Sequence, residues 1–287
     1  MLKTAVITTG GLGTRLLTYT KSNPKTMLPL YDKSDDQLHE PLLRPLIELI
    51  FEKLYDSGFR RFCFIVGEKT KKSIFSQLIP NSSYVELLKK RNVPEDRRFI
   101  RVLSRLTKKM NSCEIQWISQ ATPMGFGHAL YSAKKFVGND TFLLHAGDAY
   151  FPNYDFIPMF KKIHTSNKNT SATLLIQHKK NLKGYGIAQI KKTNRMNQVF
   201  NVEEKPKIPK SNFVILPLYI FNPEIFDALK ETPKGYNNEL QVTDAIKTLI
   251  QWEKQILSLN YGQKPWFDIG TPSNYFKSLE YSFKHSR

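Results

Sequence analysis

Glycine, arginine and lysine residues near the start of the chain could together bind a polyphosphate. Residues 10–15 read GGLGTR, and Lys25 follows in the segment NPKTMLP (residues 23–29). Glycines let the backbone curl so that several N–H groups point at one anion, and Arg15 and Lys25 add formal positive charge. The stretch therefore predicts a phosphate-binding loop.

Two other phosphate-binding motifs are missing from this loop. A dinucleotide fingerprint needs a third glycine where Leu16 stands, and a P-loop ends in Gly-Lys followed by Ser or Thr. The loop must therefore belong to a different class of site.

The elements that position this loop follow from the pattern of apolar runs. Short apolar runs alternate with helical spacing through the first half, which predicts a parallel sheet covered by helices on both faces. Ligands of such sheets bind beyond the carboxyl ends of the strands. We therefore expect residues 10–25, 120–128 and 147–148 to converge on one crevice. The expected strands lie near residues 4–8, 62–66, 115–119 and 142–144, and the expected helices near 45–57, 71–78 and 127–136.

The second half of the chain is richer in strand signals. Strands are expected at 171–177, 187–190 and 213–221, and helices at 241–251 and 274–283. Residues 32–43 predict a polar surface loop, and residues 84–110 a helical insertion split by Pro94. No linker divides the chain, so we expect one domain over residues 1–287.

Composition limits the classes of partner. Lys and Arg number 43 against 25 Asp and Glu, and the net charge of +18 favours anions. The basic runs at 69–72 and 89–91 are most simply solvated helix faces. No nucleic-acid-binding signature is present, so we expect no specific nucleic-acid partner.

The sequence also bears on the cellular compartment of the protein. No apolar run is long enough to span a membrane and no leader is evident, so we expect a cytoplasmic protein without a membrane partner. Cys63 and Cys113 fall in strand-like segments and are expected to be free thiols.

Further segments extend the pattern over nearly the whole chain. Residues 120–129 read QATPMGFGHA, residues 145–148 HAGD, residues 185–186 YG, residues 202–206 VEEKP, residues 238–244 NELQVTD and residues 266–272 WFDIGTP. With the glycine loop, these segments resemble, in order, the motifs of the sugar-1-phosphate nucleotidylyltransferases. The resemblance implies an α/β fold with a Rossmann-like, mixed but mostly parallel sheet flanked by helices. It also implies a nucleotide-binding half near residues 1–150 and a sugar-phosphate-binding half near residues 151–287.

The resemblance also implies a reaction. A sugar 1-phosphate attacks the α-phosphorus of a nucleoside triphosphate, and pyrophosphate departs. The GFGHA form of the base segment and the insertion at 84–110 favour UTP, with glucose 1-phosphate as the expected sugar. A thymidylyltransferase that uses dTTP and a non-catalytic subunit that senses nucleotide sugars are the alternatives.

Individual roles are carried over by position in the motifs. Arg15 and Lys25 would act on the triphosphate, and Asp148 and Asp268 would be catalytic residues that hold Mg²⁺. Taken alone, Asp148 could cap a helix and Asp268 could be a turn residue. Glu204 and Lys205 could likewise belong to a solvated loop, and His128 could lie in the core or at a helix start without contacting a ligand. The implied nucleotide-binding residues are Gly10, Gly11, Gly13, Thr14, Gln120, Gly125 and His128, and the implied sugar-phosphate-binding residues are Gly186, Glu204 and Lys205.

The chain departs from the family pattern at three places. Thr18 stands where proline is usual, Arg44 replaces a lysine before Pro45, and the loop at 32–43 is longer than usual. These departures leave the mobility of the loop and contacts in a possible homo-oligomer open.

Overall fold

The computed structural model describes residues 2–11, 13–33, 40–68, 70–79, 82–91, 93–122, 124–193 and 196–286. The strands are β1 (Thr4–Thr8), β2 (Pro29–Asp32), β3 (Leu42–Pro45), β4 (Arg61–Gly67), β5 (Glu114–Gln120), β6 (Phe142–Ala146), β7 (Ala149–Tyr150), β8 (Thr170–His178), β9 (Gly186–Lys192), β10 (Asn197–Glu204), β11 (Phe213–Phe221), β12 (Gln255–Asn260) and β13 (Phe267–Asp268). The α-helices are α1 (Leu17–Thr20), α2 (Leu46–Asp56), α3 (Lys71–Leu78), α4 (Ser82–Arg91), α5 (Pro94–Asn111), α6 (Phe126–Ser132), α7 (Lys134–Val137), α8 (Ile157–Thr165), α9 (Ile225–Glu231), α10 (Val242–Gln251) and α11 (Pro272–His285), and the 3₁₀ turns are η1 (Thr14–Leu16), η2 (Lys25–Met27) and η3 (Tyr236–Asn238).

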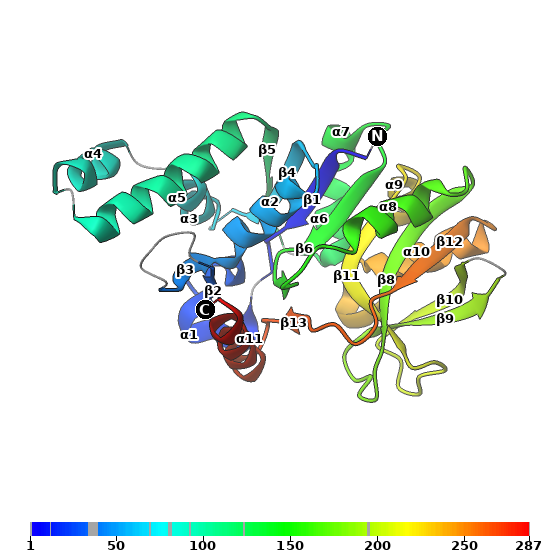
Figure 1. The fold of residues 1–287 in the computed structure, drawn as a ribbon. Coiled ribbons are helices and arrows are strands. Elements are labelled where there is room, and N and C mark those ends of the chain that lie inside the picture. Colours follow the sequence, from blue (N-terminus) through cyan, green and yellow to red (C-terminus); the bar gives the residue numbers. More distant parts are fainter. Residues whose placement is uncertain are drawn as a thin grey trace.

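One large sheet runs through the molecule (Figure 1). Its nine strands lie in the order β5-β4-β1-β6-β11-β8-β12-β10-β9. The pairings make β5, β4, β1, β6, β8, β12 and β9 run in one direction, whereas β11 and β10 run in the other. The described residues therefore confirm the predicted mixed, mostly parallel α/β sheet.

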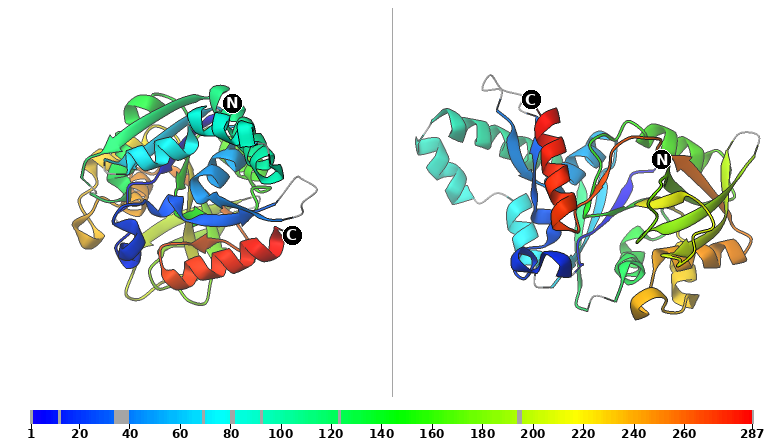
Figure 2. Two further views of the ribbon diagram at one scale, coloured as in Figure 1. Left: turned by 90° about the vertical axis from the view of Figure 1, so that its left-hand side faces the viewer. Right: turned by 90° about the horizontal axis from the view of Figure 1, so that it is seen from below.

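Alternate residues of the strands face two separate apolar layers. In β4, Phe62 and Phe64 pack with α2, α3, α5 and α8, whereas Cys63 and Ile65 pack with α6, α7, α9 and α10. This alternation follows from the two-residue period of a strand. Helices cover both faces, as Figure 2 shows from two sides, so the strand ends are left as the open edge where a ligand can bind.

The far end of the sheet curls back on itself. β9 pairs with β10 along its length and also with the start of β11, where Phe213 lies opposite Ala188. The curl brings the start of β9 close to the end of β10 and the middle of β11, which is where the second half of the chain meets the site.

Two regions differ from or add to the predicted elements. Residues 32–43 were expected to form a surface loop, but β2 and β3 pair as an antiparallel ribbon at its base, with Asp32 opposite Leu42. Residues 34–39 of that expected loop, and Lys69 of the first basic run, lie outside the described residues. The sequence pattern did not predict several further elements, namely β7, β10, β12, β13, α8 and α9.

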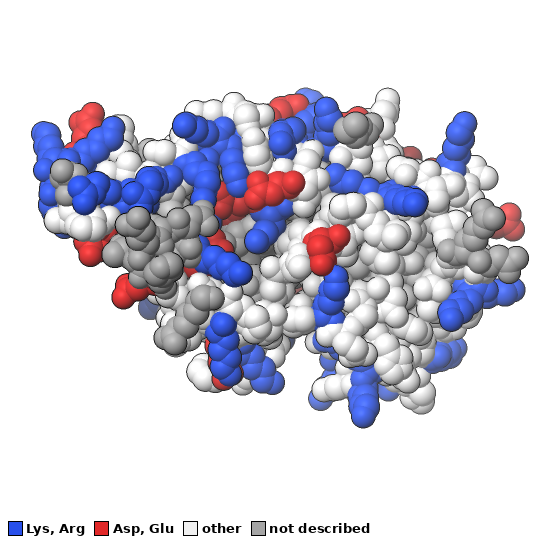
Figure 3. All heavy atoms as spheres, viewed as in Figure 1, with Lys and Arg blue, Asp and Glu red and all other residues white. Residues whose placement is uncertain are grey.

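The predicted helical insertion is confirmed. α4 and α5 extend away from the sheet, and Pro94 begins α5 (Figure 1). Lys89, Lys90 and Arg91 are exposed at the end of α4, as expected of a solvated helix face, and Figure 3 shows Lys and Arg gathered over this arm. Within the part of the chain that the structure describes, every helix is too short or too polar to cross a membrane.

Candidate active site

A cavity of about 510 Å³ opens at the carboxyl ends of the parallel strands. Thr8 at the end of β1, Gln120 at the end of β5 and Ala146 at the end of β6 all line it. The cavity lies within the usual size range of small-ligand sites. Among the predicted site residues, His128 does not line this cavity. Those that do are Gly10, Gly11, Gly13, Thr14, Arg15, Lys25, Gln120, Gly125, Asp148, Gly186, Glu204, Lys205 and Asp268.

The glycine loop is shaped by one residue in a left-handed conformation. Gly13 has φ +65°, and a Cβ there would lie 2.8 Å from Cγ2 of Thr20. The Thr20 hydroxyl donates to the Gly13 carbonyl at 2.9 Å, and the Leu16 N–H donates to the same oxygen at 2.7 Å. Only glycine fits this turn, which carries Thr14 and Arg15 to the wall of the cavity.

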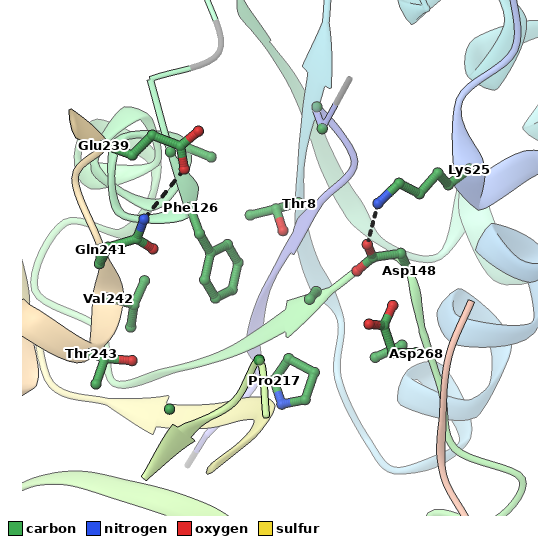
Figure 4. Close-up of a pocket in the computed structure, with 18 of the residues that line it drawn as sticks. Thr8, Lys25, Phe126, Asp148, Pro217, Glu239, Gln241, Val242, Thr243 and Asp268 are labelled. Atoms are coloured by element: carbon green, nitrogen blue, oxygen red, sulfur yellow. Dashed lines mark hydrogen bonds and ion pairs between the residues drawn. The ribbon is translucent and has the colours of Figure 1, made fainter. Parts of the chain in front are cut away.

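Two carboxylates are held side by side by a small sheet. β7 and β13 pair so that Asp268 lies opposite Ala149, and the Ile269 N–H donates to the Asp148 carbonyl at 3.0 Å. Lys25 contacts this pair directly, because its Nζ lies 2.9 Å from Asp148 Oδ2 (Figure 4). The predicted pair of acidic residues is therefore brought together from segments far apart in sequence.

The pKa values of the two carboxyl groups are shifted in opposite directions. Burial alone would raise the pKa of Asp148, but the charge and hydrogen bond of Lys25, with Arg15, outweigh burial and lower it. Burial and then the charge of Asp148 raise the pKa of Asp268, against the Gly270 N–H and the two basic residues. A cation placed between the two carboxylates would stabilise the charged form of Asp268 against burial and the charge of Asp148.

The simpler readings of these two residues have different outcomes. Asp148 is followed by β7 and not by a helix, so it caps none. Asp268 Oδ1 accepts the Gly270 N–H at 2.8 Å, so Asp268 does shape a turn. In that turn Gly270 lies close against Arg15. A Cβ on Gly270 would lie only 2.7 Å from Arg15 Nη2.

The base segment builds another wall. The Gln120 side-chain amide lies 2.8 Å from His128 Nδ1, with the amide as donor, and its oxygen faces Gly10. His128 therefore positions Gln120 and does not itself reach the cavity. Gly125 has φ +103°, and a Cβ there would lie 2.6 Å from the Leu240 carbonyl oxygen, so the segment packs directly on residues before α10.

The opposite wall comes from the curled end of the sheet. Thr243 Oγ1 donates to Glu204 Oε2 at 2.7 Å, and Lys205 Nζ lies 3.1 Å from Glu204 Oε1. Lys205 has φ +43°, a strained value for a lysine, and its N–H donates to the Tyr185 carbonyl at 3.2 Å. These contacts fix a carboxylate and an ammonium at the rim, next to Gly186.

Some lining residues carried no predicted role. Tyr185, Gln241, Thr243 and Trp266 lie inside the motif segments, and their presence there was the available signal. Pro217 lines the cavity where the pairing of β11 with β8 shifts register between Ile215 and Tyr219. A proline inside an apolar strand is the signal for such an irregularity.

The donor set limits the kind of metal that could bind. Among the described residues, no group of three or more His, Cys, Asp and Glu side chains is placed to hold a metal ion. Two carboxylates with space for phosphate oxygens and water fit Mg²⁺, which is commonly held by one or two carboxylates together with substrate phosphates.

Curated proteins with similar sequences cover nearly the whole chain. UTP–glucose-1-phosphate uridylyltransferase 2 of Streptococcus pyogenes serotype M3 is 30% identical over 295 aligned residues, which cover 99% of this chain and 91% of the relative. UTP–glucose-1-phosphate uridylyltransferase of Streptococcus pneumoniae serotype 4 is 30% identical, with 99% and 91% covered.

Solved structures share the fold. A UDP-glucose pyrophosphorylase complexed with UDP-glucose has a TM-score of 0.81 at 23% identity, with 99% of each chain covered. A UTP-bound UGPase from Acinetobacter baumannii also has a TM-score of 0.81 at 23% identity, with 100% of this chain and 95% of that chain covered. The sequence profile of the nucleotidyl transferase family matches residues 4–282. Because that match spans the glycine loop, both carboxylates and both walls of the cavity, the chain belongs to the nucleotidyl transferase family.

Proposed function

We propose that the protein transfers a uridylyl group from UTP to glucose 1-phosphate, giving UDP-glucose and pyrophosphate. The observation that carries the proposal is the meeting, in one cavity, of a cationic glycine loop, two carboxylates and the Glu204 wall. The names of the two streptococcal relatives support UTP and glucose 1-phosphate as the substrates.

The transfer needs no side-chain nucleophile. A phosphate oxygen of glucose 1-phosphate forms a bond to the α-phosphorus of UTP, and the bond from that phosphorus to the oxygen bridging to the β-phosphate breaks. The bridging oxygen leaves with pyrophosphate, which takes the electron pair. The protein contributes positioning and charge neutralisation.

Each wall of the cavity has its part in that step. The backbone around Gly11 and Gly13, with Arg15, binds the triphosphate, and Lys25 stabilises negative charge at the α-phosphate. Gln120, oriented by His128, hydrogen-bonds the base. Glu204, held by Thr243, accepts hydrogen bonds from sugar hydroxyls, and Lys205 pairs with the phosphate of the sugar.

We also propose that Asp148 and Asp268 hold Mg²⁺. The raised pKa of Asp268, caused first by burial and then by the charge of Asp148, supports a cation between them. When bound, Mg²⁺ would neutralise charge on phosphate oxygens. We place the protein in the cytoplasm, where free thiols such as that of Cys63 stay reduced.

The test is pyrophosphate release measured over a panel of nucleoside triphosphates and sugar 1-phosphates. We expect UTP with glucose 1-phosphate to give the highest specificity constant. A preference for dTTP would replace the proposal by thymidylyl transfer, and no release with any pair would favour a non-catalytic sensing subunit. Labelled UTP without sugar should leave no label on the denatured protein.

The magnesium proposal has its own variants. Asp148→Asn and Asp268→Asn keep the side-chain shape but remove one ligand charge, so turnover should fall by at least about 100-fold, as when a preorganised charge-stabilising group is lost. Asp155→Asn is the matched control, because Asp155 is exposed and pairs with Lys264. Turnover in both test variants equal to that of the control at saturating Mg²⁺ would reject the assignment.

A further inference from the structure

Lys179 lies beside the candidate active site without a role in the proposed reaction. It follows the end of β8, and its N–H donates to the Asn212 carbonyl at 2.9 Å. Its Nζ lies 4.6 Å from the ring centre of Trp266 and 4.8 Å from that of Tyr185. The ammonium is therefore held against two aromatic faces.

Both of those rings belong to the wall of the cavity, next to Asp268. The Trp266 Nε1–H donates to Gln177 Oε1 at 2.9 Å, and its ring stacks on Phe151 at 5.9 Å. Trp266 is thus held by Gln177 and Phe151, and Lys179, although it does not itself line the cavity, lies against two rings that do.

The charge of Lys179 has no anionic partner in the described part of the chain. No carboxylate there lies within ion-pair distance of its Nζ, whereas the Nζ of Lys205 lies 3.1 Å from Glu204. Its polar neighbour is the Tyr185 hydroxyl, at 3.4 Å. Burial lowers the pKa of Lys179, and the charge of Asp268 opposes that change. A partly desolvated ammonium next to a phosphate site gains from an anionic ligand.

We propose that Lys179 is a second phosphate-binding cation, which pairs with the phosphate of the sugar 1-phosphate beside Lys205. The inference rests on the proposed function for the identity of that ligand. The lysine stem is flexible, and cation–π contacts at a partly exposed site are weak, so the ammonium can leave the rings for a phosphate oxygen. A charge-assisted hydrogen bond to phosphate is stronger than the contacts that it replaces.

The experiment compares Lys179→Met with Lys180→Met. Methionine keeps an unbranched apolar stem against Trp266 and removes the charge, and Lys180 is an exposed neighbour that serves as the matched control. We expect Lys179→Met to raise the KM for glucose 1-phosphate by about 10-fold to 100-fold, the range of one hydrogen bond to a charged group. The KM for UTP should stay unchanged, and Lys179→Arg should recover part of the loss.

Direct binding gives a readout that does not depend on turnover. Calorimetry should show UDP-glucose, whose β-phosphate comes from the sugar 1-phosphate, binding more weakly to Lys179→Met, while UTP binding is kept. If wild-type protein binds UDP-glucose in this way but releases no pyrophosphate, the proposed function fails and the inference stands. Unchanged affinity for UDP-glucose, or an equal loss for UDP-glucose and UTP together with a lower melting temperature, would overturn the inference and leave Lys179 as a support for the rings.

Discussion

Two lysines line the cavity, and each pairs with a carboxylate. We expect their charges to act on the substrates at different stages of the proposed reaction. Lys25 contacts Asp148 in the acidic pair, whereas Lys205 contacts Glu204 at the sugar wall. Lys25→Ala should lower kcat by about 100-fold to 1,000-fold, because its charge is most useful where negative charge develops. Lys205→Ala should chiefly raise the KM for glucose 1-phosphate, because it pairs with a charge already present in the ground state.

Steady-state kinetics with each substrate varied in turn separates the two effects. The specificity constant of Lys205→Ala for the sugar phosphate should fall by about 30-fold to 1,000-fold, with the KM for UTP almost unchanged. A Lys205 variant that lost UTP and kept the sugar phosphate would move Glu204 and Lys205 into the nucleotide site.

His145 is a neutral residue buried behind the acidic pair. It is 0% exposed, and its Nδ1 lies 2.7 Å from the Ala146 carbonyl while its Nε2 lies 2.6 Å from the Tyr154 hydroxyl. Since a carbonyl only accepts, Nδ1 carries the proton and Nε2 accepts from Tyr154. Burial lowers the pKa of His145 to about 4, against the Ala146 carbonyl and the charge of Asp148.

This lowered pKa makes stability depend on pH. Between pH about 6.5 and 4 the unfolded chain binds a proton at His145 that the folded chain does not, so the free energy of unfolding falls as the pH falls, by about 3 kcal/mol in all. Urea unfolding at several pH values measures this loss. His145→Gln should lose less stability than wild type from pH 7 to 5, and the exposed His178→Gln should behave as wild type does. Parallel pH curves for wild type and His145→Gln would refute the assignment.

The sequence indicated residues that line the cavity more readily than the contacts that hold those residues in place. The glycine loop has its own backbone requirement, whereas the family motifs, and not local chemistry, indicated both aspartates and Glu204. His128, which the motif implies as a nucleotide-binding residue, lies outside the lining of the cavity and contacts Gln120, and only packing brings these two residues together. Lys179 follows β8 and Trp266 precedes β13, and no local pattern encodes their contact.

At the scale of elements, the ribbon of β2 and β3 is tied to α2 by one buried arginine. Arg44 is 3% exposed and lies 2.6 Å from Glu52, 3.2 Å from Glu48 and 2.8 Å from Asp32. Burial would raise the pKa of Glu52, but the charge and hydrogen bond of Arg44, together with the charges of Lys109 and Arg105, outweigh burial and lower it. The departure from lysine at this position thus serves the packing of the ribbon on α2.

Removing Arg44 should leave these carboxylates buried without their main partner. Arg44→Met should lower the free energy of unfolding by about 3 to 5 kcal/mol, the usual effect of breaking a buried ion pair from one side. Lys53→Met, on the exposed side of α2, is the control and should change it by less than about 0.5 kcal/mol. Chemical unfolding of the two variants provides the comparison, and equal midpoints would show that the ribbon does not need the buried charge.

Strong periodic elements were predictable and pairing-dependent ones were not. The segments of β1, β4 and β11 are short runs of mostly apolar residues. In a chain where such runs alternate with helices, they indicate buried strands. β7 and β13 have two residues each and exist because they pair with each other across more than a hundred positions. Such short strands carry no pattern of their own, although they hold the acidic pair in place.

Across the whole molecule, one sheet and two apolar layers join the two halves of the chain. Ile7 of the first half and Leu218 of the second share one layer, and Val6 and Ala245 share the other. β6 of the first half pairs directly with β11 of the second, with Leu144 opposite Tyr219. Neither half can bury its side of the sheet alone, so the halves should unfold together.

Tryptophan reporters in each half test this coupling. Trp117 lies on β5 and stacks on Phe64 at 4.5 Å, whereas Trp266 lies in the wall of the cavity against Phe151. Variants that keep one of these tryptophans, with the others changed to phenylalanine, report each half by fluorescence. Urea midpoints from the two reporters, each compared with circular dichroism of the same variant, should coincide, as expected for a single cooperative transition. UTP with Mg²⁺ at about 100 times its Kd should add about 2.7 kcal/mol at both reporters, since ligand binding stabilises every part of one folding unit. If the ligand raised only the Trp117 midpoint and left Trp266 to unfold separately, the chain would consist of two folding units, and the cavity would lie between domains.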